Sequence, residues 1–116
     1  ISFSDRSMLL RNDSGVFRDV REESGIRYEE THAFPAWGDF DGDGRYDLYI
    51  TSVYPGRRSF LYLNRPGGFV DATWLSGSRV FDGWQVSAVD FNNDGILDII
   101  VNEGGFLRLL EGCPDH

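Results

Sequence analysis

The sequence predicts an all-β fold: part of a β-propeller whose blades are sheets of four antiparallel strands. Two observations support this fold class. Residues 39–47 and residues 90–98 follow the same acidic pattern, and the similarity between the two halves continues outside these segments at a spacing of 51 or 52 residues. Repeats of roughly 40–50 residues that each contain several short strands are typical of propeller blades.

The repeat outside the acidic segments supports this interpretation residue by residue. Identical residues recur 52 positions apart in six pairs: Asn12 and Asn64, Gly15 and Gly67, Phe17 and Phe69, Asp19 and Asp71, Ser24 and Ser76, Gly25 and Gly77. One residue is then lost, because the acidic segments recur 51 positions apart. We therefore expect equivalent residues of the two units to have equivalent conformations.

The strands of each unit are predicted from β-branched and aromatic residues bounded by glycine-rich turns. The complete unit should contain four strands, at residues 34–40, 47–53, 59–64 and 69–72. The second unit should contain three, at residues 86–91, 97–102 and 106–110. Residues 7–12 and 16–20 read as the last two strands of a preceding unit.

The chain therefore divides into three parts. Residues 1–25 are the end of a preceding blade, residues 26–77 a complete blade, and residues 78–116 an incomplete blade. Propellers close with about 4–8 blades, so this chain cannot close a ring alone. We expect its partners to be other blades, either of the same longer chain or of copies of itself.

A short connector is expected between successive blades. Asp19 and Glu22 have the spacing of a capping box, and Gly25 is placed to end a single helical turn. Residues 71–77 repeat the arrangement with Trp74 and Leu75 in place of charged residues. The sequence therefore predicts one helical turn after the last strand of each blade.

Each acidic segment places oxygen atoms at its positions 1, 3, 5, 7 and 9, and Ca²⁺ takes roughly 6–8 oxygen ligands. The loop 39–47 would supply side-chain oxygens from Asp39, Asp41, Asp43 and Asp47 and the main-chain oxygen of Arg45. The loop 90–98 would supply side-chain oxygens from Asp90, Asn92, Asp94 and Asp98 and the main-chain oxygen of Ile96. The sequence therefore predicts two Ca²⁺ sites in β-hairpin loops.

An EF-hand and an ordinary acidic turn are the alternatives to this interpretation. An EF-hand loop ends on a bidentate Glu at position 12 and is flanked by helices, whereas position 12 is here Ile50 or Val101 and strands follow. Residues rich in Asp, Asn and Gly also form metal-free hairpin turns. Two nine-residue matches in register favour the metal loops.

Several segments resemble a known family. They are residues 9–12 (LLRN), 16–20 (VFRDV), 36–44 (AWGDFDGDG) and 61–64 (LYLN). They are similar to FG-GAP/VCBS-type repeats, the blades of integrin-α-like propellers, and most closely to those found beside ASPIC/UnbV domains. The resemblance implies a calcium-stabilised propeller, usually extracytoplasmic, that serves adhesion or assembly. The second loop reads VDFNND where the family often shows GDFDGD, which predicts weaker binding there.

Composition and motifs limit the function classes. A net charge of −8 disfavours nucleic acid as a partner, although seven acidic residues belong to the two loops. No stretch approaches the roughly 20 apolar residues of a membrane span, so this segment should not insert into a membrane. Neither histidine lies near a recognisable Ser or Cys nucleophile motif. We therefore expect no enzymatic activity.

Two functions remain. The leading one is a non-enzymatic calcium-binding module, periplasmic or extracellular, that mediates protein–protein interaction, adhesion or assembly of a larger complex. The alternative is a glycan-binding or scaffold part of a carbohydrate-active enzyme whose catalytic residues lie elsewhere. Exposed aromatic residues could serve either function. We expect Trp37 to lie in the core and Trp84 at an interface.

Overall fold

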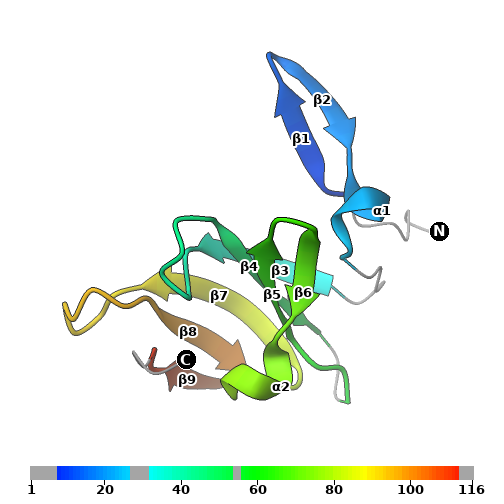
Figure 1. Cartoon of the computed structure of the whole chain (residues 1–116). Helices are drawn as coiled ribbons and strands as arrows, with labels where there is room; N and C mark the ends of the chain where they lie inside the picture. Colours follow the sequence, from blue (N-terminus) through cyan, green and yellow to red (C-terminus); the bar gives the residue numbers. More distant parts are fainter. Residues whose placement is uncertain (1–7, 27–31, 54–55, 113–116) are drawn as a thin grey trace.

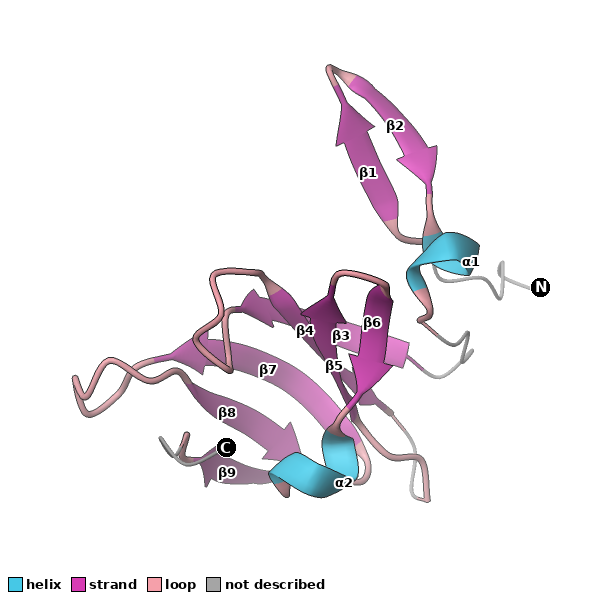
Figure 2. Ribbon diagram, in the orientation of Figure 1, coloured by secondary structure: helices cyan, strands magenta, loops and turns pink. Residues whose placement is uncertain are grey.

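The computed structural model describes residues 8–26, 32–53 and 56–112. These residues form three antiparallel sheets and two single-turn helices, so the all-β prediction is confirmed (Figures 1 and 2). The first part contains β1 (Leu10–Asp13), β2 (Val16–Asp19) and α1 (Arg21–Ser24). The second contains β3 (His32–Gly38), β4 (Asp47–Ser52), β5 (Phe60–Arg65), β6 (Gly68–Asp71) and α2 (Thr73–Ser76). The third contains β7 (Gly83–Val89), β8 (Asp98–Glu103) and β9 (Phe106–Leu110).

Each sheet is a simple meander in which every strand pairs with the next along the chain. The predicted four-stranded unit is confirmed as β3-β4-β5-β6, and the second unit as β7-β8-β9. Strand β7 begins 51 residues after β3, whereas α2 begins 52 residues after α1. The second unit is therefore one residue shorter than the first between its helical turn and its next strand, because six residues join α2 to β7 where seven join α1 to β3.

The main core lies between the four-stranded and three-stranded sheets. It is built from the buried side chains Tyr49, Leu61, Val80, Ile99 and Val101. The hydroxyl of Tyr49 is buried there, and it donates a hydrogen bond of 2.6 Å to the carbonyl of Ser78 and lies 2.9 Å from Ser59 Oγ. The phenol is thus satisfied, as buried polar groups generally are.

The two sheets approach closely at Gly83. A Cβ atom added to this buried glycine would lie 2.9 Å from both Cβ and Cγ2 of Thr51. The Thr51 hydroxyl also donates a hydrogen bond of 2.9 Å to the carbonyl of Trp84. Glycine is therefore needed for β7 to pack against β4.

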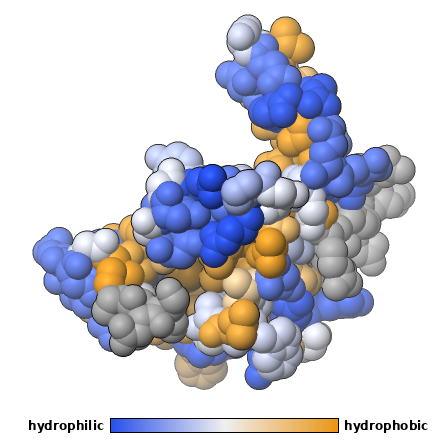
Figure 3. All heavy atoms as spheres, in the orientation of Figure 1, coloured by the Kyte–Doolittle hydropathy of each residue, from blue (hydrophilic) through white to orange (hydrophobic). Residues whose placement is uncertain are grey.

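The β1–β2 hairpin projects away from the two larger sheets (Figure 1). All eight of its residues are exposed, and hydrophobic atoms reach its surface (Figure 3), including those of Leu10, Val16 and Phe17. The expected strand at residues 7–12 begins just outside the described residues. Two exposed strands with apolar side chains are marginal by themselves.

The joint between this hairpin and the next sheet is made by main-chain atoms. A Cβ atom at Gly25 would lie 2.9 Å from the carbonyl oxygen of Phe69, and one at Gly68 would lie 2.9 Å from that of Ser24. Both glycines have positive φ angles, of 87° and 128°. Only glycine combines this conformation with so close an approach.

The single helical turns are confirmed, but the capping box is wrong. Helix α1 has Val20 at its N-cap and no side-chain capping hydrogen bond. Asp19 lies one residue earlier, and its Oδ1 accepts the amide of Arg21 at 3.0 Å, so Glu22 is not needed. Gly25 ends the turn in the left-handed conformation, as predicted.

The expectation that Trp37 lies in the core is also wrong. Its side chain is 46% exposed, and its ring packs against the edge of Phe69 with centroids 6.3 Å apart. Successive residues of a strand face opposite sides of a sheet, and it is Ala36 that is buried. Trp84 is 43% exposed, and its place at an interface stays a prediction.

Candidate metal centre

The loop between β3 and β4 folds around its first residue. Oδ1 of Asp39 accepts the amides of Gly42 at 2.9 Å and Asp43 at 3.1 Å, and Oδ2 accepts the amide of Gly44 at 2.7 Å. The two glycines have φ angles of 76° and 89°, which side chains with a Cβ resist. The carboxylate at position 1 therefore holds the turn that carries positions 3 and 5.

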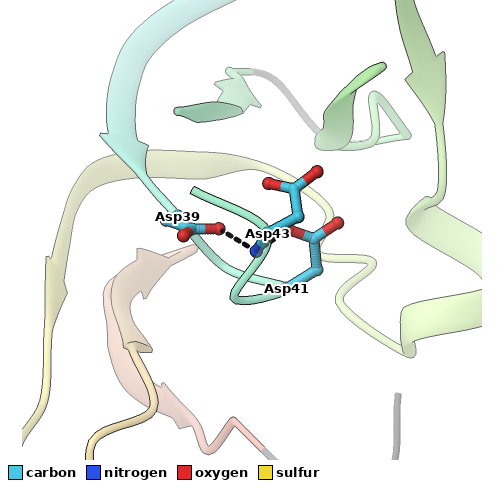
Figure 4. A group of neighbouring side chains, drawn as sticks. All are labelled: Asp39, Asp41 and Asp43. Atoms are coloured by element: carbon cyan, nitrogen blue, oxygen red, sulfur yellow. Dashed lines mark hydrogen bonds between the residues drawn. The ribbon is translucent and has the colours of Figure 1, made fainter. Parts of the chain in front are cut away.

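This turn brings three carboxylates together. Asp39, Asp41 and Asp43 each offer one oxygen, and the three oxygens lie within 4.8 Å of one another. Figure 4 shows the three side chains on one loop, with the bond from the Asp43 amide to Asp39. Carboxylate oxygens are the ligands that hard cations such as Ca²⁺ prefer. This group could therefore hold a metal ion.

A positively charged side chain, that of Arg65, lies against two of these carboxylates. Nη1 of Arg65, at the end of β5, lies 2.6 Å from Oδ2 of Asp41 and 3.2 Å from Oδ2 of Asp43. Burial alone would raise the pKa of Asp41, but hydrogen bonds, chiefly that from Arg65, outweigh it and hold the pKa below its usual value. The two carboxylates thus converge on a single cation, so the donor set fits a metal ion.

Asp47, at position 9, lies outside this group of three. It is fully buried, its Oδ2 accepts the amide of Phe40 at 2.9 Å, and its Oδ1 accepts that of Asn64 at 2.8 Å. Burial, together with the charges of Asp41 and Asp43, raises its pKa despite these bonds. Asp47 therefore ties the loop to β5, and each of its oxygens keeps one further lone pair.

Position 7 of the first loop is Arg45, whose main-chain oxygen is the predicted ligand. Its amide donates a hydrogen bond of 2.9 Å to Oδ1 of Asp43. Its guanidinium lies farther away, with Nη1 at 3.7 Å from Oδ2 of the same carboxylate. Arg45 therefore neutralises the loop less directly than Arg65 does.

The loop between β7 and β8 repeats the same folding. Asp90 accepts the amides of Asp94 at 3.1 Å and Gly95 at 2.8 Å, and Asp94 accepts the amide of Ile96 at 2.9 Å. Asn93 takes the place of Gly42 and adopts a positive φ angle of 59°. The two loops therefore share one backbone design.

The position-9 residue is also equivalent in the second loop. Asp98 is fully buried, with Oδ2 accepting the amide of Phe91 at 3.1 Å and Oδ1 that of Gly112 at 2.6 Å. One donor comes from position 2 of the loop, as it does for Asp47; the other, Gly112, lies two residues after the end of β9, whereas Asn64 lies within β5. Both position-9 carboxylates thus have a structural role.

The loops differ at position 3. Asn92 replaces Asp41, and its amide donates a hydrogen bond of 3.1 Å to Oε2 of Glu111. Within the described residues, the first loop contains the one acidic group close enough to hold a metal ion. The prediction of a site is therefore supported at the first loop, whereas the second shares only its fold.

Sequence reasoning missed Arg65 and Glu111, the two charged residues that contact position 3 of the loops. Arg65 directly follows the repeated residue Asn64 in the sequence, which was a usable signal. Its contact depends on the pairing of β5 with β4, which places it beside the loop. No comparable signal marks Glu111.

A family model described as the FG-GAP-like repeat matches residues 39–101. This is more than half of the chain, and it extends from the first residue of the first loop through the second loop into β8. No curated protein and no solved structure matches the chain significantly. The match implies propeller blades, in agreement with the four-stranded and three-stranded sheets, although the described residues do not form a closed ring. The chain belongs to the FG-GAP-like repeat family.

Proposed function

We propose that the chain is a non-enzymatic module of a β-propeller that binds Ca²⁺ through its first loop and joins other blades. The observation that carries the proposal is the convergence of Asp39, Asp41 and Asp43 within 4.8 Å. A bound cation would neutralise these carboxylates and supply the bonds that hold the turn rigid. The main-chain oxygen of Arg45 and the remaining lone pairs of Asp47 would complete the ligand set.

A second, weaker site is proposed at the second loop. Its ligands would be Asp90, Asn92, Asp94, the main-chain oxygen of Ile96, and Asp98. The neutral side chain at position 3 removes one negative charge relative to the first loop, and ligand charge is one determinant of affinity in calcium sites. The equivalent hydrogen bonds in the two loops support this proposal.

The proposed partners are other blades, since several exposed apolar side chains lie on β9 and on the β1–β2 hairpin. Phe106 and Leu107 of β9 are each 78% exposed, and the β1–β2 hairpin is exposed throughout. Unpaired strand edges invite pairing with further strands. We propose three parts, residues 1–25, 26–77 and 78–116, completed by blades of a longer chain or of other copies.

The proposal also covers where the protein is located and to which group of FG-GAP-like repeats it is related. A calcium-dependent loop suits the calcium-rich periplasm or cell exterior, and we propose that the module acts there in adhesion or in the assembly of a larger complex. The similar segments LLRN and LYLN, which lie 52 residues apart, support a relation to repeats beside ASPIC/UnbV domains. Neither described helix has the length and hydrophobicity required to cross a membrane.

Isothermal titration with Ca²⁺ tests the metal proposal. Asp43→Ala should weaken the stronger site more than Asn92→Ala weakens the weaker one, because a charged ligand is lost. Asp13→Ala, on the exposed β1–β2 hairpin, is the matched control and should leave both affinities unchanged. Absence of calcium binding, or equal losses in the three variants, would refute the ligand assignment.

A further inference from the structure

Two shallow hollows lie side by side on the surface, and none of the residues that line them belongs to the acidic loops. The first has a volume of about 370 Å³ and includes Arg57 and Arg58 in its lining. The second has a volume of about 340 Å³ and includes Glu103 and Arg108. Both are lined by the same three residues, Trp74, Arg79 and Phe81. These volumes lie near the lower end of the roughly 300–1,000 Å³ typical of small-molecule sites.

The shared arginine is held by aromatic rings. The guanidinium carbon of Arg79 lies 4.0 Å from the ring centroid of Trp74 and 5.2 Å from that of Phe81. A cation–π contact uses the flat face of the guanidinium, and its five N–H donors project from the edges. Arg79 is thus positioned while its donors are left to bind an anion.

The surface has an excess of positive charge. Arg58 is paired with Asp71 at 2.9 Å, and Arg108 with Glu103 at 2.8 Å. Neither Arg57 nor Arg79 has an ion pair with a carboxylate in the described part of the chain. Two uncompensated arginines therefore lie together on a protein whose net charge is −8.

Backbone contacts hold the first hollow in shape. Arg58 and Phe81 form an isolated antiparallel bridge, and the amide of Asp82 donates a hydrogen bond of 3.1 Å to the carbonyl of Arg57. Asp82 also accepts the indole N–H of Trp84 at 3.0 Å. The walls come from both successive units, so the hollow depends on the packing between them.

We propose that these hollows bind a carboxylate-bearing sugar chain, with one ring in each hollow. The planar guanidiniums of Arg57 and Arg79 would bind carboxylates through paired hydrogen bonds. Trp74 is 66% exposed and Phe81 41% exposed, so the ring surface that Arg79 does not cover would be open to the apolar face of a sugar. Two neighbouring hollows that share an arginine and two rings match a ligand that repeats a ring and a carboxylate.

Sugar binding in these hollows would not depend on calcium binding in the acidic loops. Uronate chains themselves bind Ca²⁺, so the binding must be measured in excess chelator. The probe is an oligomer of galacturonic acid, titrated calorimetrically into the whole chain, with circular dichroism of each variant as a check on folding. Its fully methyl-esterified form keeps the sugar rings and removes the charge.

The acidic oligomer should bind, and the methyl ester should bind at least about tenfold more weakly. Trp74→Ala and Arg79→Gln should each weaken binding about tenfold or more. Arg57→Gln, at an exposed side chain without an ion pair among the described residues, should weaken it as well and spare the fold. Arg18→Gln, on the β1–β2 hairpin, is the matched control and should change nothing.

Several results would overturn the inference. Equal affinity for the acid and the ester would exclude recognition of the carboxylate. Unchanged affinity in Arg57→Gln and Trp74→Ala would place binding elsewhere. Tighter binding of an oligoglutamate peptide of the same charge would show that the surface recognises an acidic peptide instead of a sugar.

Discussion

Asp47 and Asp98 allow a decisive test, because they are predicted metal ligands that the structure places in buried main-chain hydrogen bonds. Each accepts two amides, one from its own loop and one from the third strand of its sheet or just after it. In Asp47→Asn or Asp98→Asn, the side-chain oxygen of Asn can still accept one of the two main-chain amides. The other main-chain amide then faces the side-chain NH₂ group, which cannot accept a hydrogen bond. A hydrogen bond to a charged group contributes about 1.5–3 kcal/mol, and an unsatisfied buried donor costs about 1–3 kcal/mol.

We therefore expect each substitution to lower the free energy of unfolding by about 2–4 kcal/mol, even without metal. The assay is urea unfolding in excess chelator, followed by tryptophan fluorescence. Asp94→Asn is the control, because its exposed side chain accepts one amide that asparagine can also bind, and its effect should stay within about 0.5 kcal/mol. Wild-type stability of Asp47→Asn in chelator, combined with a loss of calcium affinity, would refute the structural role.

Three further predictions follow from contacts described above. Arg65→Gln should raise the calcium affinity of the first loop about two- to fivefold, which is the scale of an exposed ion pair, because Arg65 would compete with Ca²⁺ for the carboxylates of the loop. Calorimetry should show a smaller change for Arg45→Gln. A lower calcium affinity in Arg65→Gln would contradict this competition. Burial raises the pKa of Tyr49 to about 12, so the stability that its neutral phenol provides is complete below about pH 10 and lost as the pH rises towards 12. Tyr49→Phe should unfold about 1–3 kcal/mol more easily at neutral pH and lack this alkaline decline, which urea titrations at several pH values would reveal; an equal decline in the variant would exclude Tyr49. Gly83→Ala should cost about 1–3 kcal/mol through overpacking, whereas Gly67→Ala, where a Cβ meets open space, should stay within about 0.5 kcal/mol; equal midpoints in thermal unfolding would contradict the close packing.

Local patterns were sufficient to predict the strands, because the residues that form each turn are neighbours in the sequence and recur in the repeat. Gly67 marks the turn between β5 and β6, and Gly25 and Gly77 mark the ends of the two helical turns. The side of a strand that faces the core depends instead on distant packing. Trp37 was misplaced for this reason, since the second sheet covers the face that carries Ala36.

In the candidate site, contacts within one loop could be predicted from the sequence, whereas contacts from another strand could not. The spacing of Asp39, Asp41 and Asp43 lies within one turn, and the structure confirms that they converge. The hydrogen bond from Asn64 to Asp47 and the ion pairs of Arg65 involve β5, and they exist only because β5 pairs with β4. Sequence spacing alone therefore identifies the donors of a loop but not the groups that compete with a metal for them.

The main-chain joint at Gly25 also bears on how such an array can grow. Gly25 meets the carbonyl of Phe69, whereas Gly77, its counterpart 52 residues later, has open space around it. The same backbone contact can be made again by a further strand, with no requirement on side chains other than hydrogen at the glycine. A further unit could thus join at Gly77 through main-chain contacts alone, whatever side chains its outer surfaces carry.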